Sequence, residues 1–173
     1  DRWHGEGRLR YAFAPRFVPS CTEDLLLQTI AEARASGCLI HTHASENQDE
    51  VDLVRELTGK DNVAYLNDIG LTGPDVVLAH CIHLSDTEKN ILCESNTAIA
   101  HCPGSNFMLG SGVAPTPELL AGGARVVLGS DGAPCNNRMD IFAEMRLAAL
   151  MQKPRLGADA INASQVLDMA TVT

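Results

Sequence analysis

Five short apolar runs, separated by longer stretches with helical spacing, constrain the fold more than any other feature of this sequence. Each run is rich in Val, Ile, Leu and Ala, as are strands of a parallel sheet that are buried on both faces. Polar residues, Gly or Pro follow every run, and this alternation is typical of βαβ units in an α/β fold. The predicted strands are residues 9–14, 38–42, 76–79, 97–100 and 125–128.

The stretches between these runs show helical patterns with recognisable starts and stops. In residues 22–36 apolar side chains recur at helical spacing, with Thr22 as the expected N-cap and Gly37 as the stop. Residues 85–95 open with a Ser and a Glu three positions apart, which is the spacing of a capping box. The other helices are predicted at residues 47–58, 117–121, 139–152 and 164–170.

Composition narrows the class of protein and the kind of partner. The chain has 173 residues, of which 45% are hydrophobic and 20% charged, as in an ordinary globular protein. A net charge of -9 without a visible basic patch argues against nucleic acid or an anionic membrane and favours a small-molecule partner. No apolar run approaches the roughly 20 residues that span a bilayer, and no signal-peptide pattern is present, so the expected location is the cytoplasm.

Chemically active side chains fall at or just past the ends of successive apolar runs. In a parallel barrel the active site is built at the carboxyl ends of the strands, where side chains from different strands converge. One histidine at a strand end is more often held by backbone partners, but several such residues together favour a site. The residues concerned are His41, His43, His80, His101 and Asp131.

The donor atoms of these residues suit a divalent metal ion. Imidazole nitrogen and carboxylate oxygen bind Zn²⁺ or Fe²⁺, and a catalytic site uses about three protein ligands with one position open for water. His43 and Asp131 are the candidate ligands. Glu46 stands just before a predicted helix, and a carboxylate beside activated water suits the proton transfers of hydrolytic deamination. The alternative for Glu46 is a carboxylate that the helix dipole favours.

Four segments resemble the fifth to eighth strand motifs of the amidohydrolase superfamily. They are residues 41–46 (HTHASE), 78–84 (LAHCIHL), 101–106 (HCPGSN) and 128–137 (LGSDGAPCNN). Within the superfamily the chain is most similar to the branch that deaminates adenosine-type nucleosides, guanine and aminotriazines. The resemblance implies a TIM-type (β/α)8 barrel, of which this chain supplies about strands 4 to 8, and one divalent ion, Zn or Fe.

The resemblance also implies roles for individual residues. His43 is implied as a metal ligand, Glu46 as the proton shuttle, and Asp131 as both ligand and general base. His80 is implied as the histidine that orients and polarises the attacking water, and it is also a candidate ligand.

Two further residues are candidates for substrate binding. Residues 14–21 (APRFVPSC) resemble a loop of guanine and nucleoside deaminases in which the arginine faces the base, and a guanidinium fork fits the acceptor edge of a purine. Arg16 is therefore a candidate, with a surface arginine as the alternative. Asn106 follows His101 in the family pattern, where loop geometry explains it equally well. Glu144 and Arg146 are expected to form surface or interdomain pairs.

The family pattern begins with a first-strand His-x-His that supplies two further metal ligands, and no second His-x-His precedes His41. Five strands also fall short of a complete barrel, which has eight strands and typically about 250 residues. Residues 1–173 are therefore expected to be a single fragment of a catalytic barrel, truncated at both ends and inactive alone. The complete enzyme is expected to act on an aminated heterocycle, with a homo-oligomer as an open possibility.

Other functions compete with purine deamination. Guanine deaminase or aminotriazine (chloro)hydrolase activity would use the same chemistry, and a binding module or an inactive fragment is the non-enzyme alternative. A cytidine-deaminase type of zinc enzyme requires His-x-Glu together with Pro-Cys-x-x-Cys, and this sequence has no Pro-Cys-x-x-Cys. A non-haem iron oxygenase also uses two histidines and a carboxylate, but the rhythm of parallel strands and crossover helices argues against it.

Overall fold

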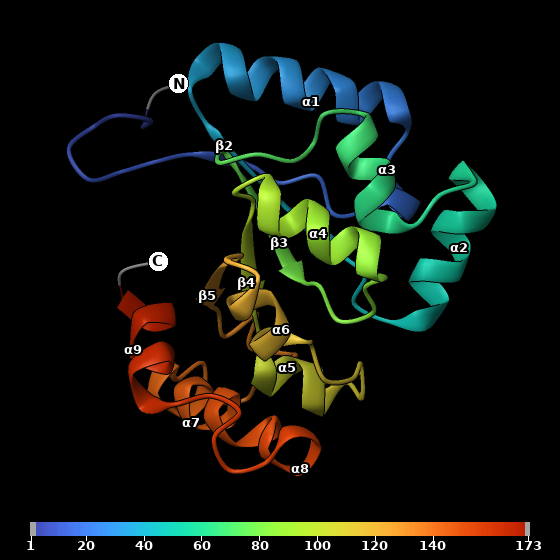
Figure 1. The fold of residues 1–173 in the computed structure, drawn as a ribbon. Coiled ribbons are helices and arrows are strands. Elements are labelled where there is room, and N and C mark those ends of the chain that lie inside the picture. The colour runs from blue at the N-terminus through green and yellow to red at the C-terminus, as the bar shows by residue number, and fades with distance from the viewer. Residues whose placement is uncertain (1–2, 172–173) are drawn as a thin grey trace.

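The computed structural model describes residues 3–171, which form one parallel sheet with helices packed along it (Figure 1). The strands follow one another in the order β1-β2-β3-β4-β5, and every neighbouring pair is parallel. Sequential parallel strands with helical connections form the wall of a (β/α)8 barrel, so the fold is a partial TIM-type barrel, as predicted. The strands are β1 (Ala12–Phe13), β2 (Leu39–Ala44), β3 (Val76–His80), β4 (Ala98–His101) and β5 (Arg125–Leu128).

The two ends of the sheet are open within the described part of the chain. β1 is much shorter than the predicted residues 9–14, because only Ala12 and Phe13 pair with β2. β5 pairs with β4 on one side and, among residues 3–171, with no strand on the other. Both outer strands therefore present unpaired backbone groups along one edge.

The helices begin largely where the sequence places a cap. The Thr22 side chain accepts the Leu25 N–H, Gly37 ends α1 with φ 67, and Ser85 and Glu88 form the predicted capping box. Three short helices, α3, α5 and α8, were not predicted. The helices are α1 (Glu23–Ser36), α2 (Gln48–Thr58), α3 (Asn62–Asp68), α4 (Asp86–Glu94), α5 (Pro103–Met108), α6 (Thr116–Ala121), α7 (Ile141–Met151), α8 (Lys153–Leu156) and α9 (Ala163–Thr171), with a 3-10 turn at Val18–Ser20.

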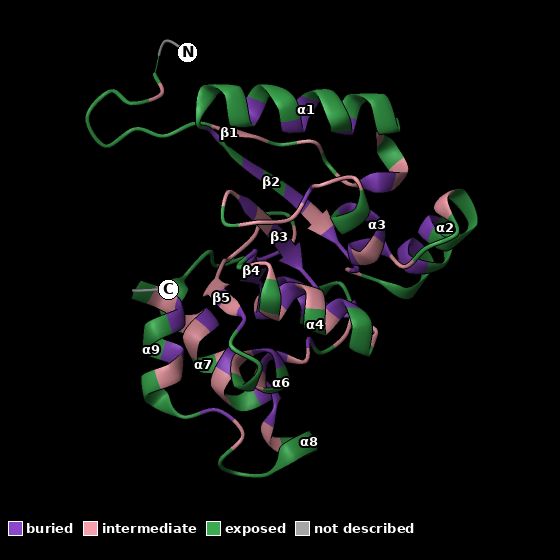
Figure 2. Cartoon of the chain, turned by 45° about the horizontal axis from the view of Figure 1, so that its top comes forward, coloured by how far each residue is buried: buried purple, intermediate pink, exposed green. Residues whose placement is uncertain are grey.

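The hydrophobic core lies between the helices and one face of the sheet. Ile40, Leu78, Ile99 and Val126, from four neighbouring strands, are at most 1% exposed and belong to one cluster with residues of the helices. Figure 2 shows the buried residues concentrated on the central strands and on one side of each long helix. Strand residues alternate between faces, and Leu39 on the opposite face of β2 is 42% exposed. That opposite face corresponds to the interior of a closed barrel.

None of the helices in residues 3–171 is long and apolar enough to cross a membrane. All six cysteines are free thiols.

Candidate active site

The backbone is strained where β2, β3 and β5 end. Ser45 has φ 54, His80 has φ 72 and Asp131 has φ 61. Such left-handed values are uncommon for residues other than glycine and cost on the order of 1–3 kcal/mol each. These residues lie at the carboxyl edge of the sheet, where the sequence predicts the site. Their left-handed values change the direction in which the chain leaves each strand.

The side chains of His43, Glu46, His80, Asn106 and Asp131 lie together and are called the cluster around His80 below. His80 is the last residue of β3 and is 1% exposed. Its Nδ1 is 2.9 Å from Oδ1 of Asn106, so Nδ1 carries the proton and donates to the amide oxygen. Nε2 is then an acceptor, and it lies 3.8 Å from Oε2 of Glu46. The imidazole also stacks on that of His43, with ring centroids 5.4 Å apart.

His43 lies within β2, two residues after His41, and a hydrogen bond to the backbone fixes its ring. Its Nδ1 is 2.8 Å from the backbone oxygen of Arg16, which is an acceptor, so Nδ1 is the protonated nitrogen. Nε2 is left with a lone pair. A histidine that donates one ring N–H to a backbone carbonyl and offers the other nitrogen has the arrangement of a metal ligand.

The carboxylate of Asp131 is fixed by two short hydrogen bonds. Oδ2 accepts from the Ser105 hydroxyl at 2.6 Å, and Oδ1 accepts from the Gly132 N–H at 2.6 Å. Burial works to raise the pKa of Asp131, but these bonds and the nearby His80 and His43 outweigh it and hold the pKa below its usual value. The group is thus ionised at neutral pH, as a metal ligand must be.

Glu46 is half-buried between two neighbours of the cluster. Besides its approach to His80, Oε1 lies 3.4 Å from the Ser111 hydroxyl, which donates to it. The backbone oxygen of Ser111 in turn accepts from Nε2 of His83 at 2.8 Å. The Glu46 carboxylate is therefore held beside an imidazole and a hydroxyl instead of pointing to solvent at the start of α2.

His101 and Asn106 are, like His80, almost completely buried. Asn106 is fully buried and contacts His80, so a direct contact with substrate stays a prediction. His101 ends β4 and is 1% exposed, and neither ring nitrogen has a hydrogen-bond partner within the described chain. Burial, together with the nearby His80, lowers the pKa of His101 to about 4.

Arg16 and His41 lie at the exposed margin of the cluster. The Arg16 guanidinium lies 5.2 Å over the Phe17 ring, and its link to the cluster is the backbone carbonyl that holds His43. A contact between Arg16 and substrate stays a prediction. Burial, then His43 and His80, lower the pKa of His41.

The donor set fits part of a divalent metal site. His43 Nε2 and the Asp131 carboxylate have the chemistry of metal ligands. The other ring nitrogen of His43 is hydrogen-bonded to the Arg16 carbonyl, and the carboxylate of Asp131 accepts from Ser105 and Gly132. Residues 3–171 nevertheless contain no group of three or more His, Cys, Asp or Glu side chains that could hold a metal ion. That two further ligands come from a first-strand His-x-His stays a prediction.

Glu144 is buried, which corrects the expectation that it forms a surface or interdomain pair. It is 1% exposed, and its two oxygens accept from the Gly104 N–H at 2.8 Å and from Nδ2 of Asn136 at 2.6 Å. Asn136 also donates to the backbone oxygen of Ser130 at 2.9 Å. Glu144 thereby ties the start of α5 to the loop that carries Asp131. A glutamate in the first turn of a helix is ordinarily expected at the surface.

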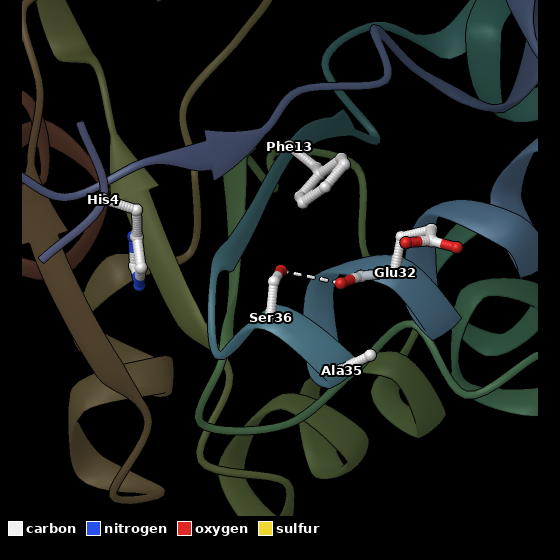
Figure 3. A pocket seen from close by; sticks show the side chains of 5 residues that line it. All are labelled: His4, Phe13, Glu32, Ala35 and Ser36. Atoms are coloured by element: carbon white, nitrogen blue, oxygen red, sulfur yellow. Dashed lines mark hydrogen bonds between the residues drawn. The ribbon is translucent and has the colours of Figure 1, made fainter. Parts of the chain in front are cut away.

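A hollow of about 420 Å³ lies elsewhere, between β1 and the end of α1 (Figure 3). Within it the Ser36 hydroxyl donates to the backbone oxygen of Glu32 at 2.7 Å. The hollow shares no residue with the cluster around His80. It is lined by His4, Phe13, Glu32, Ala35 and Ser36.

A parallel (β/α) wall with histidines and an aspartate at its carboxyl edge defines the class of barrel proteins that build their sites at that edge. Comparison with known families assigns the particular family. The profile of the Amidohydrolase family matches residues 2–173, and the chain belongs to this family.

Two curated relatives match almost the whole chain. One is a 5-methylthioadenosine/S-adenosylhomocysteine deaminase of Desulfitobacterium hafniense, 44% identical over 168 residues, which are 97% of this chain and 39% of that protein. The other is a 5'-deoxyadenosine deaminase of Methanothermobacter thermautotrophicus, 42% identical over 98% of this chain and 40% of that protein. The chain thus spans about two fifths of the length of these relatives.

Solved structures also match nearly all of this chain over about two fifths of their own length. An adenosine deaminase from Xanthomonas campestris with bound zinc superposes with a TM-score of 0.94 at 28% identity, covering 98% of this chain and 39% of that one. Guanine deaminase of E. coli gives 0.91 at 29% identity, over 98% and 40%. Atrazine chlorohydrolase of Arthrobacter aurescens TC1, complexed with zinc, gives 0.92 at 28% identity, over 98% and 39%.

Proposed function

We propose that this chain is part of a metal-dependent hydrolase of non-peptide carbon–nitrogen bonds. The proposed reaction is hydrolytic deamination of a purine nucleoside or base of the adenosine type, such as 5'-deoxyadenosine or S-adenosylhomocysteine. The observation that carries the proposal is the Glu46 carboxylate 3.8 Å from Nε2 of His80, with His43 stacked on the same ring. The two deaminases that are 44% and 42% identical support the choice of substrate class.

Deamination adds water to the ring carbon that bears the amino group, after which the carbon–nitrogen bond breaks and ammonia leaves. A divalent ion held by His43 and Asp131, with ligands from the rest of the barrel, would lower the pKa of that water. The zinc in two of the similar structures supports Zn²⁺ over Fe²⁺.

The proton transfers fall to this chain's own side chains. Nε2 of His80 is an acceptor, since Nδ1–H donates to Asn106, so it can accept a hydrogen bond from the water and orient it. The ionised Asp131 can take the proton from the water as general base. The water gives up two protons as its oxygen becomes the carbonyl oxygen of the product. Glu46 can pass one of them to the ring nitrogen and the other to the departing amine, because its carboxylate lies 3.8 Å from the His80 nitrogen that would orient the water.

A second candidate is guanine deamination or the hydrolysis of an aminotriazine or chlorotriazine. The guanine deaminase and the atrazine chlorohydrolase described above superpose nearly as well as the adenosine deaminase does. Under this alternative the same residues activate water, and only the ring and the leaving group differ.

The test measures the products released by the longest natural reading frame that contains this chain, referred to below as the complete protein. It is incubated with 5'-deoxyadenosine, S-adenosylhomocysteine, adenosine, guanine, an aminotriazine and a chlorotriazine. We expect ammonia from an adenosine-type substrate, and loss of that activity in Glu46→Gln. Chloride without ammonia, or ammonia from guanine alone, would overturn the proposed substrate class.

A further inference from the structure

Glu50, in the first turn of α2, is a buried carboxylate that binds the backbone on which Glu46 stands. It is 5% exposed. Its Oε1 accepts from the Ser45 N–H at 3.1 Å, and its Oε2 accepts from the Glu46 N–H at 2.8 Å. A third hydrogen bond, from Nδ2 of Asn62 to Oε1 at 2.6 Å, fixes the carboxylate from the side of α3.

This arrangement differs from an ordinary capping box. Asn47 is the N-cap of α2, and its side chain accepts the N–H of Glu50. In a capping box the carboxylate at this position returns to the N–H of the N-cap residue itself. Glu50 instead reaches past Asn47 to the two preceding residues, the second of which is Glu46.

The next long helix contains the ordinary version of the motif. Glu88 stands at the same position of α4, is 1% exposed, and accepts from the N–H and hydroxyl of its own N-cap, Ser85. It also accepts the Val63 N–H at 2.7 Å. Glu88 therefore matches Glu50 in burial, helix position and type of bond, but it binds no residue of the cluster around His80.

The backbone beside Glu46 needs such an acceptor. Ser45 is in the left-handed region, with φ 54, and the turn after it directs Glu46 back toward His80. The successive N–H groups of Ser45 and Glu46 donate to the two different oxygens of the Glu50 carboxylate. Because a strained backbone persists only where its surroundings hold it, these bonds account for the direction of the turn.

We propose that Glu50 is a positioning residue, whose carboxylate aims Glu46 at His80 by binding the backbone amides of Ser45 and Glu46. This inference rests on the proposed function of Glu46 as the proton shuttle. The conservative variant is Glu50→Gln, which keeps the size and one acceptor oxygen but turns an NH₂ group toward one of the two N–H donors. Glu88→Gln is the matched control.

The kinetic test uses the complete protein and the substrate found above. For Glu50→Gln we expect kcat to fall roughly 10- to 100-fold with KM unchanged, as for other residues that orient a catalytic group. Glu88→Gln is expected to keep kcat, although its stability falls in the same way. Equal effects of the two variants on kcat, or an effect of Glu50→Gln on KM alone, would overturn the proposal.

Hydrogen exchange supplies a measurement that does not depend on activity. The amides of Ser45 and Glu46 are expected to be protected in the wild-type protein and in Glu88→Gln, and to exchange faster in Glu50→Gln. If the wild-type protein deaminates nothing, the proposed function fails and exchange still decides the role of Glu50. Unchanged protection in Glu50→Gln overturns that role.

A second variant serves if Glu50→Gln does not fold. Glu50→Asp is shorter by one methylene and cannot span both amides. It replaces Glu50→Gln in both measurements, with the same expected and contradicting results.

Discussion

His101 shows how burial sets the charge of a single residue at this edge of the sheet. Its ring has no hydrogen-bond partner within residues 3–171, and burial, helped by His80, lowers its pKa to about 4. An unfolded histidine titrates near 6.5. Between these two values the unfolded chain binds a proton that the folded chain does not, so folding stability must fall as the pH falls.

We expect the metal-free protein to lose up to about 3 kcal/mol of unfolding free energy through His101 between pH 7 and pH 4. Denaturant unfolding at several pH values measures this loss. His101→Gln removes the titrating group, so its stability is expected to depend less steeply on pH in this range. Equal slopes for the wild type and the variant would show that His101 is not held neutral in the fold.

The candidate site residues were predictable from sequence to different degrees. The positions of His43, His80 and Asp131 could be predicted because the end of an apolar run marks the end of a strand, and a barrel brings the carboxyl ends of its strands together. Ser105, which holds Asp131, could not, because a hydroxyl bond over 26 positions leaves no local pattern. Glu50 left one unused signal, since Asn47 and Glu50 have capping-box spacing.

Gly104 sets how closely α5 approaches α7. A Cβ at Gly104 would lie 2.5 Å from Oε1 of Glu144 and 2.7 Å from Nδ2 of Asn136. Both groups are buried and bonded to each other, so neither can withdraw without breaking a hydrogen bond. Only a glycine fits at this contact, although an alanine would favour the helix by up to about 1 kcal/mol.

Gly104→Ala is expected to destabilise the protein by about 1–3 kcal/mol, because overpacking and the loss of a buried hydrogen bond outweigh the gain in helix propensity. Thermal or denaturant unfolding measures the change. Gly132→Ala serves as the control, since its nearest atom would be Cδ of Pro134 at 3.6 Å and its stability should stay within about 0.5 kcal/mol. A Gly104→Ala variant as stable as the control would contradict this description of the contact.

Most elements could be predicted from sequence, and the exceptions have physical reasons. β5 matches its predicted bounds, and the caps of α1 and α4 form as expected. α5 was missed because its Pro-Gly-Ser start is typical of a turn, although proline at the first helical position is also a helix signal. α3 was missed because its seven residues are too few for a clear helical pattern of apolar side chains. β1 is shorter than its apolar run because strand pairing, not composition, defines it.

The sheet as a whole is an open part of a barrel, with five strands where a closed barrel has eight. Among the described residues 3–171 its outer strands have unpaired edges, and the face that a closed barrel would cover exposes apolar side chains such as Leu39. Open edges and exposed apolar faces favour association between chains. We expect the isolated 173-residue chain to self-associate in light scattering at micromolar concentration, and a monodisperse monomer would contradict this.

We propose that His43 and Asp131 are two ligands of a metal site that the rest of the barrel completes. The most direct test is the metal content of three purified proteins by elemental analysis: the complete protein, its Asp131→Ala variant, and the isolated chain. We predict one zinc or iron ion per complete protein and less than a tenth of that in the other two. A full equivalent of metal in Asp131→Ala, or tightly held in the isolated chain, would contradict the claim.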